Sequence, residues 1–219
     1  GRPIPHFGQR GCWSDNQQRC RRINQREDQY GGTTENRTRI VKEIYQRARK
    51  KVGDGFPILI KFNTTDFISG GNDLNEAVRV GQILGGVGFA AIEASGGMWE
   101  SCTRPQEELG WIPVIMAESR TGIKTYDQEA YFLSSAKALK EKTNAAIILV
   151  GGLRSFTKIE EVLNSNAADF ISMSRPLIRQ PDLPSLWRSE EGPEKAECIS
   201  CNACLPIGNS PMDCRIKNP

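Results

Sequence analysis

The sequence is poor in several features that would each indicate a class of function. It contains a single histidine, His6, so a Ser/His/Asp triad or a metal site with several histidine ligands would depend on that one residue. No apolar run approaches the roughly 18 residues that cross a membrane, and the Arg-rich and Gln-rich start has no apolar signal-peptide core. We therefore expect a soluble, cytoplasmic protein without a membrane partner.

An excess of charge of one sign is also missing. The 29 Lys and Arg residues are interleaved with 26 Asp and Glu residues, which leaves a formal net charge of +3. Nucleic-acid-binding domains cluster their basic side chains on one face, so we expect no DNA or RNA partner. A chain of 219 residues, 38% of them hydrophobic, is long enough to bury one sizeable core.

Cysteine, in contrast, is concentrated at one end of the chain. Cys198, Cys201 and Cys204 have CxxCxxC spacing, and Cys214 follows ten positions later. A secreted disulfide framework would distribute its cysteines more evenly, whereas a tight cluster in a cytoplasmic chain more often holds a metal. An iron–sulfur centre and a zinc site both fit this spacing, and the remaining alternative is a group of thiols that bind no metal.

From residue 34 onward, helix-length amphipathic segments alternate with short apolar runs, a pattern typical of βα units with a parallel sheet. The predicted helices are 34–52, 73–84, 127–142 and 156–164, and the predicted strands are 57–62, 89–94, 146–150 and 169–173. A short terminal helix is expected near 186–187. Residues 97–126 interrupt the alternation and predict a long loop that covers an active site. Four strands cannot close a (β/α)₈ barrel, so the α/β chain is a small open sheet or part of a barrel.

Two loops that follow predicted strands have the composition of a phosphate site. Gly151, Gly152 and Arg154 follow one apolar strand, and Ser174 and Arg175 follow the next. In βα barrels, the loops after the last two strands commonly bind a phosphate through backbone N–H groups, a helix N-terminus and a guanidinium. The alternative is that the glycines only make a tight turn and that both arginines are solvated.

Lys61 lies inside the apolar run 58–63, where a buried charge is costly unless it meets an anion or an electron-rich cofactor. We interpret it as a site residue, although a lysine near the end of a strand can also extend to water. Asp66, Glu93 and Glu118 are candidate acids or bases near strand ends, where carboxylates are also often merely solvated.

Five segments together resemble the old yellow enzyme family of NADH:flavin oxidoreductases, in particular its 2,4-dienoyl-CoA reductase-like branch. They are residues 24–37 (NQREDQYGGTTENR), 150–154, 174–178, 181–183 and 198–204. The resemblance implies an eight-stranded TIM barrel that binds FMN at its C-terminal mouth, of which this chain contains strands five to eight. It divides the chain into an unmatched and poorly ordered start (1–22), a half-barrel (23–190) and a cysteine-rich tail (191–219).

The resemblance also assigns cofactor residues. Lys61 takes the position near the pyrimidine edge of the flavin, and Gly151, Gly152, Ser174 and Arg175 take the positions around the FMN phosphate. The four clustered cysteines resemble the ligands of the [4Fe-4S] cluster of the larger members. NAD(P)H is the implied reductant and a small molecule the implied substrate.

One departure from the family concerns catalysis. The stretch 8–13, where the family carries a histidine pair and a tyrosine, contains neither, and no catalytic residue can be assigned. We expect an incomplete FMN-dependent oxidoreductase domain with weak or no turnover, which self-associates or needs the missing N-terminal half. The alternatives are a metal-binding remnant without catalysis, or a TIM-barrel lyase or isomerase that binds a phosphorylated substrate.

Overall fold

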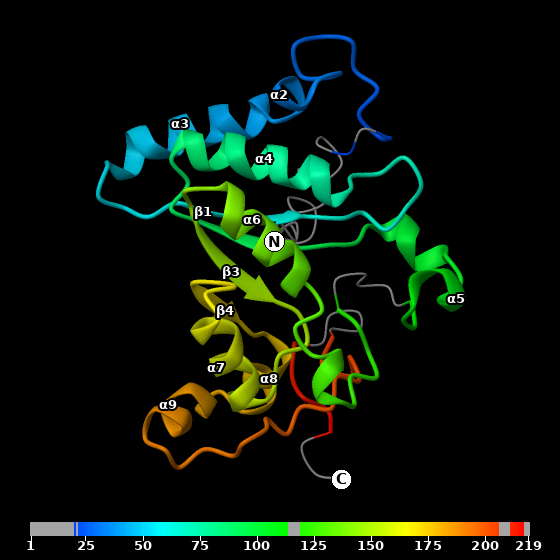
Figure 1. Cartoon of the computed structure of the whole chain (residues 1–219), viewed down its shortest axis with the longest axis vertical. Helices are drawn as coiled ribbons and strands as arrows, with labels where there is room; N and C mark the ends of the chain where they lie inside the picture. Colours follow the sequence, from blue (N-terminus) through cyan, green and yellow to red (C-terminus); the bar gives the residue numbers. More distant parts are fainter. Residues whose placement is uncertain (1–19, 21, 114–118, 206–210, 217–219) are drawn as a thin grey trace, which may run out of the picture.

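The computed structural model describes residues 20, 22–113, 119–205 and 211–216. Its centre is a parallel sheet whose strands lie in chain order (Figure 1). The strands are β1 (Leu59–Asn63), β2 (Ala91–Ser95), β3 (Ala146–Val150) and β4 (Phe170–Ser172). Neighbours in sequence are therefore neighbours in space, which is the arrangement of a barrel arc built from successive βα units.

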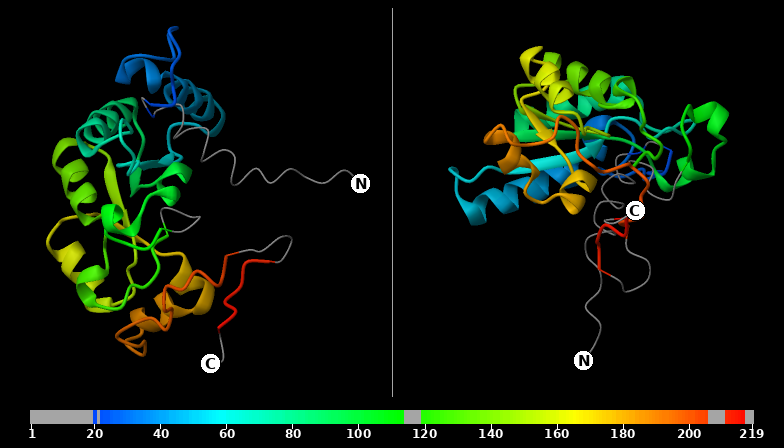
Figure 2. Two further views of the ribbon diagram at one scale, coloured as in Figure 1. Left: turned by 90° about the vertical axis from the view of Figure 1, so that its right-hand side faces the viewer. Right: turned by 90° about the horizontal axis from the view of Figure 1, so that it is seen from below.

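Helices precede β1 and follow each of the four strands. The longer ones are α3 (Arg39–Val52), α4 (Leu74–Val87), α6 (Leu133–Lys142) and α7 (Phe156–Asn164). The short ones are α2 (Thr34–Arg37), α5 (Gln106–Leu109), α8 (Arg175–Arg179), α9 (Leu183–Arg188) and the 3₁₀ turns η1 (Trp99–Thr103) and η2 (Tyr126–Gln128). Figure 2 shows α4, α6 and α7 along the outer side of the sheet and the C-terminal segment on the opposite side. Within the described ranges, no helix is both long and apolar enough to cross a membrane.

The two faces of the sheet differ in burial. Phe62, Ile147 and Leu149 point to the helices and are at most 1% exposed. On the opposite face, Leu59 of β1 is 52% exposed and Phe170 of β4 is 57% exposed. Parallel sheets normally have both faces covered, whereas here the second face is exposed at both edge strands within the described part of the chain.

Most predicted elements are present. The bounds of β1, β2, β4 and α4 differ from the predicted ranges by one to three residues, and two predicted helices differ more. The strand at 146–150 and the helix at 156–164 have the predicted bounds. The predicted helix 34–52 is split at Thr38, whose hydroxyl donates to the carbonyls of Thr34 and Glu35. The predicted helix 127–142 begins only at Leu133, because Ala130 has a φ of 56° that interrupts a right-handed helix. The short helix α8 was not predicted.

Candidate functional site

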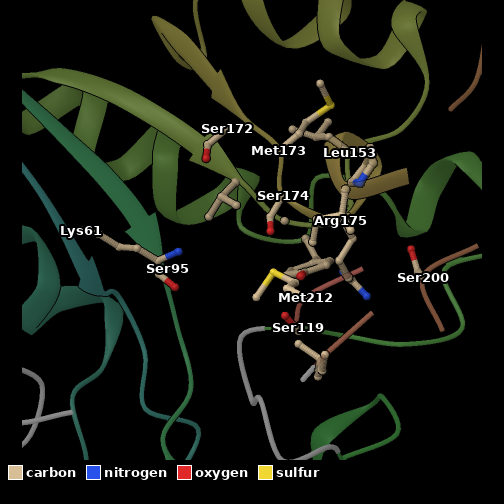
Figure 3. Close-up of a pocket in the computed structure, with 17 residues that line it drawn as sticks. Lys61, Ser95, Ser119, Leu153, Ser172, Met173, Ser174, Arg175, Ser200 and Met212 are labelled. Carbon is tan, nitrogen blue, oxygen red and sulfur yellow. The ribbon is translucent and has the colours of Figure 1, made fainter. Parts of the chain in front are cut away.

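A hollow of about 190 Å³ lies at the carboxyl ends of β2, β3 and β4 (Figure 3). All five residues that the sequence predicts around FMN line it, namely Lys61, Gly151, Gly152, Ser174 and Arg175. The other lining residues are Ser95, Ser119, Tyr131, Val150, Leu153, Ser172, Met173, Pro176, Ile178, Ser200, Leu205 and Met212. Segments far apart in sequence, including the cysteine tail, therefore share one cavity.

The glycine pair forms one wall of the hollow. Gly151 and Gly152 have φ values of 129° and 72°, which side chains rarely adopt. A Cβ atom on Gly151 would lie 3.0 Å from the ring of Tyr131, and one on Gly152 would lie 2.9 Å from it. Both the backbone conformation and this ring therefore require glycine here.

Arg175, the first residue of α8, also lines the hollow. Its Nη1 donates to the carbonyl oxygen of Arg120 at 2.9 Å and to Oδ1 of Asn202 at 2.7 Å. Within the described part of the chain, Nε and Nη2 of Arg175 have no hydrogen-bond acceptor. The guanidinium is thus held at one nitrogen and keeps two nitrogens available for an anion.

Arg154 does not take part in this hollow, which corrects both sequence interpretations of that residue. Its side chain is only 5% exposed, so it is not solvated. The guanidinium donates to the carbonyl oxygen of Cys198 at 2.7 Å and to that of Ile123, and its own carbonyl accepts from Ala196 N at 2.9 Å. Arg154 therefore fastens the start of the cysteine tail to the loop after β3.

Glu129, which sequence reasoning missed, closes the N-terminus of α7. Its buried carboxylate accepts from Arg154 N at 2.8 Å, from Ser155 N at 2.9 Å and from Ser155 Oγ at 2.8 Å. Glu129 thus satisfies the N–H groups of the N-cap residue and of the residue before it, whereas the first N–H groups of the helix, of Phe156 and Thr157, donate to the carbonyl oxygen and Oε1 of Glu194. The N-terminus of α7 is thus occupied by a side chain and is not open to a phosphate.

Lys61 has an anionic partner within the protein. Its Nζ lies 2.8 Å from Oε1 of Glu93 on the neighbouring strand. Asp66 is fully buried and accepts from Asn72 N at 2.7 Å, so it stabilises the loop after β1. Neither carboxylate is merely solvated; Glu118 and His6 lie outside the described residues.

Residues 97–126, the segment that interrupts the βα alternation (the interrupting segment), contribute Ser119 to the lining of the hollow, with Arg120 next to it. The Arg120 guanidinium lies 3.8 Å from the ring centroid of Trp111 and 4.3 Å from that of Tyr131, as in a cation–π cluster. Burial lowers the pKa of Arg120 from its usual value. The segment predicted to cover a site therefore supplies part of its wall.

The four clustered cysteines line a second, smaller hollow together with Arg175 and Arg179. Burial and, to a lesser extent, the neighbouring Cys198 raise the pKa of the Cys204 thiol, and Arg179 Nη1 lies 3.6 Å from Cys214 Sγ. Across the described ranges, no three Cys, His, Asp or Glu side chains converge closely enough to hold a metal ion. The predicted ligands share a hollow but are not arranged as a finished metal site.

Comparisons with known proteins agree with this architecture. The NADH oxidase of Thermoanaerobacter brockii is 30% identical over 181 residues, which are 83% of this chain and 25% of that protein. The 4,4'-dithiodibutanoate disulfide reductase of Rhodococcus erythropolis is 25% identical over 211 residues, which are 90% of this chain and 52% of that protein. The structure of 2-naphthoyl-CoA reductase with 2-naphthoyl-CoA matches with a TM-score of 0.73 and 25% identity, covering 87% of this chain and 26% of the other.

The chain therefore spans between about a quarter and a half of the length of these relatives. A family model matches residues 17–192, which include the whole sheet and both loops of the hollow. The match begins shortly before the segments whose motifs resemble flavin oxidoreductases and ends ahead of the clustered cysteines. The resemblance is confirmed: the chain belongs to the NADH:flavin oxidoreductase / NADH oxidase family.

Proposed function

We propose that the hollow binds FMN and that the chain is the cofactor-binding half of an NAD(P)H-dependent flavin oxidoreductase. The observation that carries the proposal is the meeting of Lys61, the Gly151–Gly152 loop and Ser174–Arg175 in one cavity. The phosphate would lie between the glycine loop and Arg175, and the ring system would extend toward Lys61. When bound, the flavin supplies hydride transfer from NAD(P)H to a small-molecule acceptor.

The residues present suit a phosphate. Glycine backbone lets N–H groups approach oxygen atoms closely, and the available Nε and Nη2 of Arg175 form the fork that pairs with two phosphate oxygens. Because Glu129 and Glu194 already accept from the N–H groups at the N-terminus of α7, the phosphate would be held on the Arg175 side of the loop. At the other end, a cation at Lys61 favours the anionic reduced ring.

We further propose that β1 to β4 are strands five to eight of a TIM barrel. The parallel order of the strands and the half-open sheet support this assignment, as does the partial length of the match to every reported relative. The first four strands would come from a longer polypeptide or from a second, different chain. The proposed division remains 1–22, 23–190 and 191–219.

A metal or [4Fe-4S] site in the cysteine tail is a second proposal. Its support is that Cys198, Cys201, Cys204 and Cys214 line one hollow and that no disulfide joins the described cysteines. Cysteines in the reduced state are typical of cytoplasmic proteins, which is the location we propose. We assign no step of the reaction to this site.

Flavin binding tests the first proposal directly. The purified chain is titrated with FMN and with riboflavin, which lacks the phosphate, and dissociation constants are obtained from flavin fluorescence. FMN should bind more tightly, and Arg175→Ala should weaken FMN by about 10- to 100-fold without changing riboflavin, as expected for charge-assisted hydrogen bonds. Arg47→Ala, at an exposed position of α3, is the matched control. Equal affinity of the wild-type chain for the two flavins would contradict the proposal.

The absorption spectrum of the purified chain distinguishes bound flavin from an iron–sulfur centre. Bands near roughly 375 and 450 nm indicate flavin, whereas a shoulder at about 400–420 nm that bleaches with dithionite indicates an iron–sulfur centre. A colourless protein that contains zinc would favour the metal-binding alternative. A chain without metal after reconstitution would contradict the second proposal.

A further inference from the structure

Asn202 lies inside the cysteine motif, yet its side chain bonds to residues that line the hollow proposed to bind FMN, which we call the flavin-side hollow. Oδ1 accepts from Arg175 Nη1 at 2.7 Å, and Nδ2 donates to the carbonyl oxygen of Ser119 at 3.0 Å. The acceptor meets a donor and the donor meets an acceptor, so the network itself determines the orientation of the amide. One side chain thus joins the tail, the interrupting segment and the loop after β4.

The backbone at Asn202 has the conformation that this bridge requires. Its φ is 62°, in the left-handed region where asparagine is tolerated better than most residues. Ser200, two positions earlier, also has a positive φ, of 56°, and lines the flavin-side hollow. The turn between Cys198 and Cys204 is therefore folded so that its polar side chains meet the neighbouring cavity.

The hydrogen bond to Asn202 holds the guanidinium of Arg175, the group that would bind the phosphate. Arg175 lines both hollows, and its Nη1 is held by Asn202 and by the carbonyl oxygen of Arg120. A long arginine side chain loses considerable rotamer freedom when it binds a ligand. Two acceptors that already fix one nitrogen reduce that loss and direct the remaining nitrogens toward the anion.

We propose that Asn202 is a positioning residue that orients Arg175 toward the flavin phosphate, so that the fold of the cysteine motif helps to set flavin affinity. The inference rests on the proposed FMN site. Since coupling between two sites is reciprocal, FMN also stabilises the turn that carries Cys201 and Cys204.

The test compares FMN and riboflavin binding in Asn202→Gly, Arg175→Ala and the double variant. Glycine removes the amide and accepts a positive φ without strain, so the backbone is not penalised. Asn202→Gly should weaken FMN about tenfold and leave riboflavin within about twofold, because a hydrogen bond to a charged group is lost. In the Arg175→Ala background the same change should have no further effect on FMN.

Asn166→Gly is the matched control, since Asn166 is exposed and has a similar φ of 54° but lies outside both hollows. The inference is overturned if Asn202→Gly leaves FMN affinity unchanged, weakens both flavins equally, or still weakens FMN when Arg175 is absent. A wild-type chain that does not prefer FMN over riboflavin would instead remove the proposed phosphate site, and this inference with it.

Discussion

Lys61 and Glu93 form an ion pair across β1 and β2 on the open face of the sheet, with 2.8 Å between Lys61 Nζ and Glu93 Oε1. The two residues are direct partners in the strand register. Their side chains are 41% and 20% exposed, so solvent weakens the pair only in part. Because Lys61 also lines the flavin-side hollow, Glu93 controls how much positive charge that hollow receives.

The charge balance of this pair should be visible in the midpoint potential of bound FMN. Glu93→Gln removes the counter-charge and should raise the potential, because the anionic reduced flavin is stabilised; Lys61→Gln should lower it. Shifts on the order of 30 mV correspond to about 1.4 kcal/mol for a two-electron couple. Spectroelectrochemical titration measures them. Lys140→Gln, which breaks an ion pair with Asp169 outside the hollow, is the control, and shifts of equal sign in both test variants would contradict the prediction.

The buried Glu129 should be important for stability. Glu129→Gln keeps the shape of the side chain but cannot accept from all three donors of Arg154 and Ser155. Unsatisfied buried donors cost about 1–3 kcal/mol, and urea unfolding should show a loss of this size. Glu141→Gln, at an exposed position of α6, should change stability by less than about 0.5 kcal/mol. Equal midpoints for the two variants would show that the carboxylate is dispensable.

The residues predicted to hold the cofactor stand out in the sequence because each belongs to a short segment directly after or within an apolar run. Parallel strands bring their carboxyl ends to one edge, so Gly151, Gly152, Ser174 and Arg175 meet in space although two loops carry them. The strand at 146–150 can be recognised for a similar reason, since it lies in an apolar run between Asn144 and Gly151 that needs no reference to the rest of the chain.

Interactions with distant partners could not be predicted in this way. The carboxylate of Glu129 bonds to residues about 25 positions later, and Arg154 bonds to Cys198, 44 positions away. Neither has a local pattern that distinguishes it from a solvated charge. The partner of Lys61 depends on strand register, which the apolar pattern of a single strand does not determine.

Two glycine substitutions should have opposite effects on stability. Gly152→Ala places a methyl group 2.9 Å from the Tyr131 ring at a φ of 72°, so the free energy of unfolding should fall by about 1–3 kcal/mol. Gly86→Ala lies within α4, where an added Cβ meets nothing within 4 Å, and should raise it by about 0.5–1 kcal/mol. Thermal unfolding of both variants measures the difference. A neutral Gly152→Ala would mean that the turn can move away from the ring.

The thiols should differ strongly in reactivity. Burial, then the charge of Asp66 and a hydrogen bond to it, raises the pKa of Cys20 to about 11, whereas Cys201 is exposed. The thiolate is the reactive form, so at pH 8 iodoacetamide should modify Cys201 well before Cys20. Mass spectrometry of peptides after timed quenching gives both rates. Comparable rates would show that the Cys20 region opens in solution.

The same pKa predicts a pH dependence of stability. A thiol in the unfolded chain loses its proton near its ordinary pKa of 9.0, whereas folded Cys20 keeps its proton until about pH 11. Its contribution to stability is therefore complete below pH 9 and is lost as the pH rises through 11, because only the unfolded state gains the thiolate in that interval. Urea unfolding of the wild type and of Cys20→Ala between pH 8 and about 11 measures this, and the variant should show the shallower decline. Parallel declines would mean that Cys20 titrates alike in both states, and the burial beside Asp66 would then not persist in solution.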